Sequence, residues 1–210
     1  MSFKDLSLRK KILITFVAVI IVGGLVSLLV GSRLIRSTLL SQAQNKVKHD
    51  LAAARMVFDE KINDIRNIIG LTAARESLRD AIPPGRHDIL LRYLSRVRED
   101  YGLDMLNLTD AAGRILVRTR RPDAPADDMS VDPLVRRALG GGLHSGVQIV
   151  PREELLREGE DLAARAYMNI LPTPMAADRP ETLETRGMML RAAAAIRDGE
   201  GRILGALYGG

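Results

Sequence analysis

Five polar side chains on or beside the predicted strands of this sequence could bind a small molecule. They are Arg118, His144, Arg165, Tyr167 and Arg191. A guanidinium donates paired hydrogen bonds to a carboxylate, so an organic acid is the ligand class that this set predicts. Arg165 is the strongest candidate because "LAARAYMNI" is otherwise apolar around it, and Tyr167 has the same side-chain parity on that predicted strand.

The alternative for each of these five residues is a position on a solvated strand face. His144 stands alone, which is typical of a structural or exposed histidine, and we predict no metal ligand. The sequence has no phosphate-binding Walker loop, no G-x-S-x-G and no H-E-x-x-H, so we predict neither catalytic residues nor a cofactor.

The composition limits the partners of this chain of 210 residues. Its formal net charge is only +5, its arginines are scattered, and only 3% of its residues are aromatic. Single-stranded nucleic acid requires aromatic and basic residues interleaved in one groove, so we predict no nucleic-acid partner. The chain has no cysteine, which excludes disulfides and Cys-ligated zinc without fixing the compartment.

Residues 12–32 contain no charged side chain. A run of about 20 such residues is long enough for a helix to cross a bilayer, and we predict a transmembrane helix there. A cleaved signal peptide is the alternative, but its apolar region would be shorter. Lys4 and Arg9 to Lys11 precede the run, whereas only Arg33 and Arg36 follow it closely, so residues 1–11 are predicted to be cytoplasmic.

Small residues recur at every fourth position of the predicted span, at Gly23, Ser27 and Gly31. Such a stripe lets two membrane helices approach closely, so these residues are candidates for dimerisation within the bilayer. The alternative is that glycine is simply common in membrane helices.

Residues 33–82 continue with helical spacing. Leu40, Leu51 and Ile62 are eleven residues apart, which is the period of a nearly straight helix rather than of a left-handed coiled coil. Pro83 and Pro84 are predicted to end this helix. Its apolar stripe could form a homodimer seam, pack on the following domain, or do both in succession.

The remaining sequence predicts an α+β domain with one antiparallel sheet. Strands are expected around two similar turns, "DAAG" from Asp110 and "DGEG" from Asp198, with helices at 88–101 and after Asp132-Pro133. "REELLREGED" is interpreted as a charged turn, followed by a strand from Leu162. Asp110 and Asp198 are interpreted as turn residues rather than catalytic ones.

The ordered series "LTDAAGRIL", "DPLVRRALGGG", "GEDLAARAYMNILPTP" and "GMMLRAAAAIRDGEGRILGALYGG" resembles the Cache domain over residues 33–210. Cache domains are PAS-like extracytoplasmic sensors of bacterial histidine kinases and chemoreceptors. The resemblance implies a transmembrane helix that continues into a long helix packed on a PAS-like sheet, with the sensor domain at 86–210. A small ligand would then bind on the concave face of the sheet. The amino-acid-binding pattern of the family includes a tryptophan that this chain lacks, so that pattern is not carried over.

From the resemblance we expect the input module of a two-component sensor histidine kinase. It would be anchored in the bacterial plasma membrane, with its sensor domain periplasmic or extracellular and no enzymatic activity of its own. The sequence is expected to be an N-terminal fragment that stops before a second membrane helix. Two alternatives remain: the same domain in a methyl-accepting chemotaxis receptor or diguanylate cyclase, and a membrane-tethered scaffold that binds no ligand.

Overall fold

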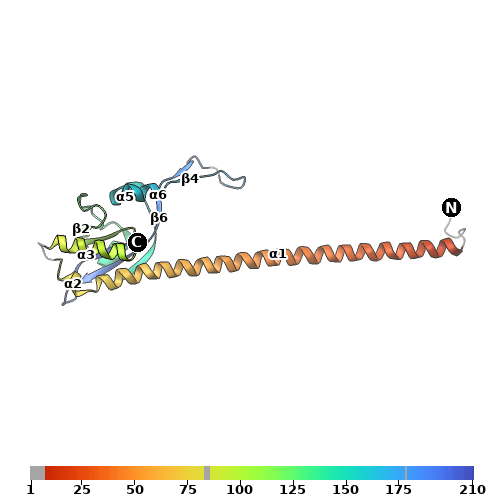
Figure 1. The fold of residues 1–210 in the computed structure, drawn as a ribbon, viewed down its shortest axis with the longest axis horizontal. Helices are drawn as coiled ribbons and strands as arrows, with labels where there is room; N and C mark the ends of the chain where they lie inside the picture. The colour runs from red at the N-terminus through yellow and green to blue at the C-terminus, as the bar shows by residue number, and fades with distance from the viewer. Residues whose placement is uncertain (1–7, 83–85, 178) are drawn as a thin grey trace. The chain divides into compact units, whose positions relative to one another are not determined.

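The computed structural model describes residues 8–82, 86–177 and 179–210, without the side chains of residues 8, 10, 11, 15, 29–41 and 43. The chain divides into two compact units, Met1–Met56 and Val57–Gly210. The described residues of the first unit are helical, and the second unit contains the sheet that was predicted from the sequence (Figure 1). Residues 1–7 and 83–85 lie outside the described residues, so the structure does not test the prediction for Lys4 or the prediction that Pro83 and Pro84 end the long helix.

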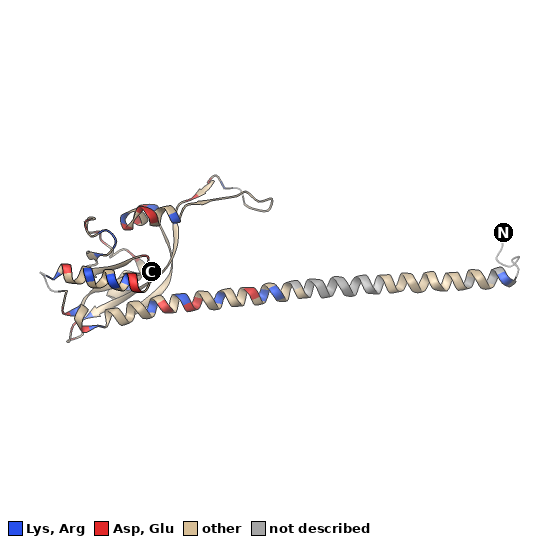
Figure 2. Ribbon diagram, viewed as in Figure 1, with Lys and Arg blue, Asp and Glu red and all other residues tan. Residues whose placement is uncertain are grey.

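Helix α1 (Leu8–Ala73) begins in the first unit and ends in the second. Figure 2 shows a stretch of α1 without charged residues, in which the apolar side chains are exposed, Leu28 at 75%. Within the described part of the chain, no helix was found that combines the length and the apolar character needed to cross a membrane. The last four residues of the predicted span, Gly31 among them, lie outside the side chains that are described.

The long helix ends at Ala73 and not at Ile82 as predicted, and a short helix α2 (Glu76–Arg79) follows it. The chain turns at Arg75, whose backbone is extended with φ −72° and ψ 130°. This turn brings Leu78, which is fully buried, into the apolar core. A helix continued in a straight line could not place Leu78 there, so burial overrides the helical pattern of the sequence.

A five-stranded antiparallel sheet in the order β2-β1-β7-β6-β3 forms the centre of the second unit. Its strands are β1 (Leu106–Asp110), β2 (Ile115–Arg118), β3 (Leu143–Val150), β6 (Gly187–Arg197) and β7 (Ile203–Gly209). The predicted helices are present as α3 (His87–Asp100) and α4 (Pro133–Leu139). The predicted α+β class and antiparallel sheet are therefore confirmed.

The two repeated turns have the same construction. Asp110 Oδ1 accepts hydrogen bonds from the backbone N–H groups of Ala112 and Arg114, and Asp198 Oδ1 accepts them from Glu200 and Arg202, all at 2.8–2.9 Å. Gly113 and Gly201 follow at φ +88° and +84°, which glycine adopts without strain. The repeat is thus a repeated hairpin turn, as interpreted from the sequence.

The segment after β3 differs from the prediction. The expected charged turn is helix α5 (Arg152–Glu158), and most of the expected strand from Leu162 is helix α6 (Glu160–Arg165). Only the two-residue strand β4 (Met168–Asn169) follows, paired with β5 (Leu183–Glu184) outside the main sheet. Leu155, Leu162 and Ala163 recur at helical spacing and are buried, and the apolar run after Leu162 was wrongly interpreted as a strand.

The sheet carries a different core on each face. Leu106, Leu108 and Leu207 pack with the end of α1, α2 and α3 in one apolar cluster. Their neighbours along the strands point the other way, where Ala206 and Tyr208 pack beneath α4, α5 and α6. In Figure 1, α5 and α6 lie on the opposite side of the sheet from the last turns of α1. The second face is the one that could hold a ligand, because it contains buried polar side chains.

Candidate ligand-binding site

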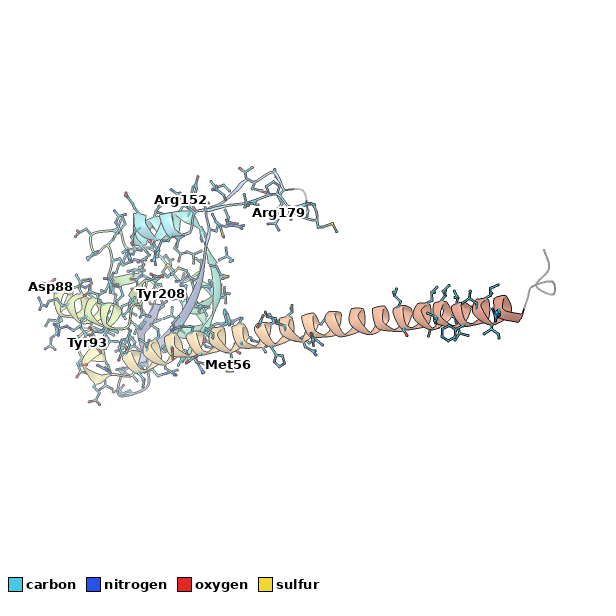
Figure 3. The ribbon with its side chains drawn as sticks, turned by 45° about the vertical axis from the view of Figure 1, so that its right-hand side comes forward. Met56, Asp88, Tyr93, Arg152, Arg179 and Tyr208 are labelled. Carbon is cyan, nitrogen blue, oxygen red and sulfur yellow. The ribbon has the colours of Figure 1, made fainter. Side chains whose placement is uncertain are left out.

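Strand register aligns one row of residues across the second face of the sheet. Arg118 of β2 is opposite Asn107 of β1, Asn107 is opposite Tyr208 of β7, and Ala193 of β6 joins Tyr208 to His144 of β3. Figure 3 marks Tyr208 in the sheet and Arg152 at the start of α5, which covers this face. The site is therefore set by the sheet below and by short helices above.

Arg118 is buried and held by acceptors from the loop after β2 and from α5. Its Nη2 donates to Asp127 Oδ2 at 2.5 Å, and its Nη1 donates to the carbonyl oxygen of Pro125 at 3.3 Å. Its Nε lies 3.2 Å from Glu158 Oε1, an ion pair without the geometry of a hydrogen bond. Asp127 also pairs with Arg157 of α5 at 3.4 Å.

Arg191 is only 2% exposed and is the largest fully buried side chain among the described residues. Its Nη1 donates to Asp132 Oδ2 at 3.2 Å and to Glu154 Oε1 at 3.3 Å. Its guanidinium lies 5.3 Å from the centre of the Tyr208 ring, a cation–π contact. Nε and Nη2 of Arg191 have no hydrogen-bond partner, so one edge of this buried cation is unsatisfied.

Glu158 is buried beside Arg118 and Asn107. Asn107 Nδ2 donates to Glu158 Oε1 at 2.8 Å and to the Tyr208 hydroxyl at 3.2 Å, whereas Glu158 Oε2 has no partner. Burial raises the pKa of Glu158 above its ordinary value, and the positive charge of Arg118 offsets only part of that rise. Burial likewise raises the pKa of Tyr208, so its hydroxyl stays protonated at neutral pH.

Carboxyl groups outnumber guanidiniums in this cluster. Arg118 and Arg191 contact Asp127, Asp132, Glu154 and Glu158, and Arg157 also pairs with Asp127, which makes three cations against four acids. The pKa of Glu154 is also raised, first by burial and then by Asp132, while Arg191 lowers it in part. The cluster can therefore hold a proton, and its acids compete with any anion for the two guanidiniums.

The structure brings together two of the five residues proposed from the sequence, Arg118 and Arg191, and places His144, partly exposed, in the row of Arg118. It does not bring Arg165 and Tyr167 to them. Arg165 ends α6 and forms an exposed ion pair with Asp104, and Tyr167 follows α6 with 54% of its surface exposed. The parity that favoured Arg165 does not apply, because the segment is helical.

Sequence reasoning missed the acids and the amide that surround the two arginines. Asp132 was identified only as a helix start, and its Oδ1 does accept from the N–H groups of Leu134 and Val135 while Oδ2 accepts from Arg191. Glu154 and Glu158 were assigned to a turn. Their spacing of four residues, which places both on one helix face, is the signal that could have identified them.

Two cavities in the second unit lie elsewhere. The larger, of about 710 Å³, lies between the end of α1 and the start of β6 and is bordered by Ile65, Ile68 and Met188. The smaller is a groove of about 540 Å³ beside Leu156 and Tyr167. Neither is bordered by Arg118 or Arg191. The arginine cluster is closed in this structure.

Two solved domains from signalling proteins are similar in fold to this chain. The chain is similar to the sensor domain of the histidine kinase DctB from V. cholerae, with a TM-score of 0.57 and 16% identity, over 79% of this chain and 54% of that one. It is also similar to a domain of a sensory box/GGDEF family protein from Vibrio parahaemolyticus, with a TM-score of 0.51 and 17% identity, over 77% and 57% of the two chains.

By sequence, no protein-family model matches the chain, and no curated protein matches it. The chain spans little more than half the length of the two solved domains. At such low identity the likeness concerns the fold alone. The sensor-domain fold predicted from the resemblance is confirmed at that level: this chain has the same fold as the DctB sensor domain.

Proposed function

We propose that this chain is the extracytoplasmic ligand-sensing input module of a two-component sensor histidine kinase. The fold supports this proposal, because the solved domains similar to it are sensory. The site supports it further, because the buried polar groups gather on one face of the sheet under short helices. The chain itself carries no output activity in this proposal.

The observation that carries the ligand proposal is the unsatisfied edge of Arg191. A buried donor without a partner costs about 1–3 kcal/mol, and more when it is charged. A carboxylate placed against Nε and Nη2 would accept two parallel hydrogen bonds and remove that cost. We therefore propose an organic acid as the ligand, with Arg191 as its anchor, Arg118 as the second cation, and His144 at the edge of the same row.

Membrane anchoring through residues 12–32 is part of the proposal. Consecutive side chains such as Ile12, Leu13 and Ile14 are all exposed, although they point to different sides of the helix. A helix that is apolar on every side is stable only within a core or a bilayer. The excess of positive charge before residue 12 favours a cytoplasmic N-terminus, with the sheet outside the cytoplasm.

Signalling would be a shift between two populations of the sensor. A ligand that binds one arrangement of the sheet and its covering helices more tightly favours that arrangement by the difference in affinity. In a homodimer, held in part by Gly23, Ser27 and Gly31, such a shift would displace α1 through the bilayer. A cyclase output is the second candidate, because one of the similar solved domains comes from a GGDEF family protein.

Thermal denaturation of the 210-residue chain in detergent micelles tests the ligand proposal. We expect at least one organic acid in a broad panel to raise Tm, since a ligand at about 100 times Kd stabilises by about 2.7 kcal/mol. The shift should disappear in Arg191→Gln and persist in Arg136→Gln, which changes an exposed arginine of α4. A panel without any response would favour the scaffold alternative.

A further inference from the structure

We propose that α5 is an internal lid whose Glu154 and Glu158 occupy the two site arginines when no ligand is bound. Glu154 contacts Arg191 at 3.3 Å, and Glu158 contacts Arg118 at 3.2 Å. An anionic ligand could pair with the open Nε–Nη2 edge of Arg191 beside Glu154, but it would have to displace Glu158 before it could also pair with Nε of Arg118. This inference rests on the proposed function for its biological role, but the contacts themselves can be tested separately.

The geometry of α5 allows both contacts to be released together. Residues 154 and 158 are one helical turn apart and project from the same side of a seven-residue helix. The helix is bounded by Pro151 and Gly159 and is fixed in the core chiefly by Leu155, which is 2% exposed. A small displacement of this one element would withdraw both acids, whereas Asp127 and Asp132 belong to other segments and would stay.

Glu158 is a poor permanent partner for Arg118. Its Oε2 is buried without a hydrogen bond, and its contact with Arg118 Nε lacks hydrogen-bond geometry. A free carboxylate could align both of its oxygens with a guanidinium, which a side chain tied to α5 does not do here. In the closed state, Glu158 Oε2 and Arg118 Nε therefore have no hydrogen bond. Replacement of the Glu158 carboxylate by a ligand carboxylate would give Arg118 Nε a hydrogen-bond acceptor.

The exchange has a charge requirement. When a ligand carboxylate enters and the Glu158 carboxylate leaves to solvent, the number of charges near Arg118 is unchanged. A neutral molecule of the same shape would leave Arg118 with Asp127 as its one remaining carboxylate partner and with no acceptor charge beside Nε, which is unfavourable for a buried cation. The lid thus selects for anions, and Glu158 acts as a specificity-determining residue through its competition with the ligand.

Chemical rescue with acetate tests this lid. The full chain is compared as wild type, Glu158→Ala and Glu153→Ala, the last being a matched change at an exposed position of α5. Tm is measured in sodium acetate and in acetamide with sodium chloride at equal ionic strength. Acetate should raise the Tm of Glu158→Ala by several degrees more than acetamide does, because it replaces the missing carboxylate beside Arg118. Wild type and Glu153→Ala should not distinguish the two solutes.

Two results would overturn the proposal: an equal response of all three proteins to acetate, or a Glu158→Ala variant as stable as wild type without acetate. If Glu158→Ala does not fold, amide hydrogen exchange in Glu158→Gln takes its place, since glutamine keeps the volume without the charge. Exchange of the Leu155 and Gly159 amides, which close turns of α5, should then be at least several-fold faster than in wild type. An unchanged exchange rate at the Leu155 and Gly159 amides would also contradict the lid proposal.

The two proposals can fail separately. If acetate rescues Glu158→Ala but no organic acid stabilises the wild type, α5 covers the arginines and the ligand proposal is wrong. If organic acids stabilise the wild type through Arg191 while acetate rescue fails, the site binds its ligand without displacing Glu158.

Discussion

The two faces of the central sheet are stabilised in different ways. The face beneath α1, α2 and α3 is covered mainly by apolar side chains and has no buried charge among the described residues, with Leu94 and Leu207 completely buried. The opposite face mixes aliphatic side chains with Arg118, Arg191 and four carboxyl groups. Apolar packing is non-directional and does not require one particular partner. A buried charge, in contrast, requires an opposite charge or a hydrogen-bond partner at a defined position. The first face therefore provides stability, and the second is the face whose stability can depend on a ligand.

Truncation of Arg191 should give the largest effect. Arg191→Ala leaves the buried Asp132 and the half-buried Glu154 without their cation, and breaking a buried pair such as Arg191–Asp132 costs about 3–5 kcal/mol. Arg191→Met removes the charge but keeps most of the side-chain volume. The difference in unfolding free energy between Arg191→Ala and Arg191→Met, measured in urea, therefore gives the cost of the cavity alone. Equal stability of Arg191→Ala and wild type would show that the two faces do not differ as described.

An apolar truncation on the other face should be nearly as costly but different in kind. Leu94→Ala removes a fully buried side chain of α3 and should cost about 2–5 kcal/mol. The loss should be the same with or without an organic acid and should vary little with pH. The stabilisation by an organic acid is measured for both variants by the same urea denaturation. If Leu94→Ala loses as much of this stabilisation as Arg191→Ala does, the two faces do not differ as described.

Asp132 joins the second face to the start of α4, and its two functions can be separated. Asp132→Ala loses both the helix cap and the contact with Arg191, and the cap alone is worth about 0.5–2 kcal/mol. Asp132→Asn keeps an oxygen for the cap but loses the charge. We expect the asparagine variant to retain α4 by amide exchange while Arg191 loses part of its pairing. Equal exchange in α4 for both variants would argue against the cap.

The smallest effect is the dependence of stability on pH. The pKa of Glu158 is raised in the folded state, so the folded chain binds more protons than the unfolded chain between the ordinary pKa and the raised one. Stability should therefore fall as pH rises through that window, by at most about 1.4 kcal/mol per pH unit for one group. Arg118, Arg191, Asn107, Tyr208 and Glu154 surround the group and set this window.

Glu158→Gln should flatten this part of the curve of Tm against pH, which begins above the ordinary glutamate pKa of about 4.3. Glu153→Gln, at an exposed position, is the matched control. A rise of wild-type stability with pH in the same interval would contradict the assignment. Glu154, whose pKa is raised as well, should contribute a second, similar part.

The sequence by itself determined the strands, the repeated turns and the class of the fold. Alternation of apolar residues and the pairs Asp110–Gly113 and Asp198–Gly201 are local signals, since each depends on neighbours within a few residues. Arg118 and Arg191 were proposed because they lie on or beside predicted strands, whereas the argument from apolar surroundings favoured Arg165, which the structure places at the end of α6. Local patterns failed where helix and strand produce similar short apolar runs, as in the segment after Leu162.

Only the tertiary structure decided which acids meet which arginines. Glu158 and Arg118 are forty residues apart, and Arg191 and Asp132 are fifty-nine apart. Their contact depends on the strand order β2-β1-β7-β6-β3 and on where α4 and α5 pack, which no local pattern specifies. The side chain of an arginine can reach a ligand or a neighbouring acid equally well. The packing of α5 decides between them, because burial makes an unpaired charge far more costly than it is in water.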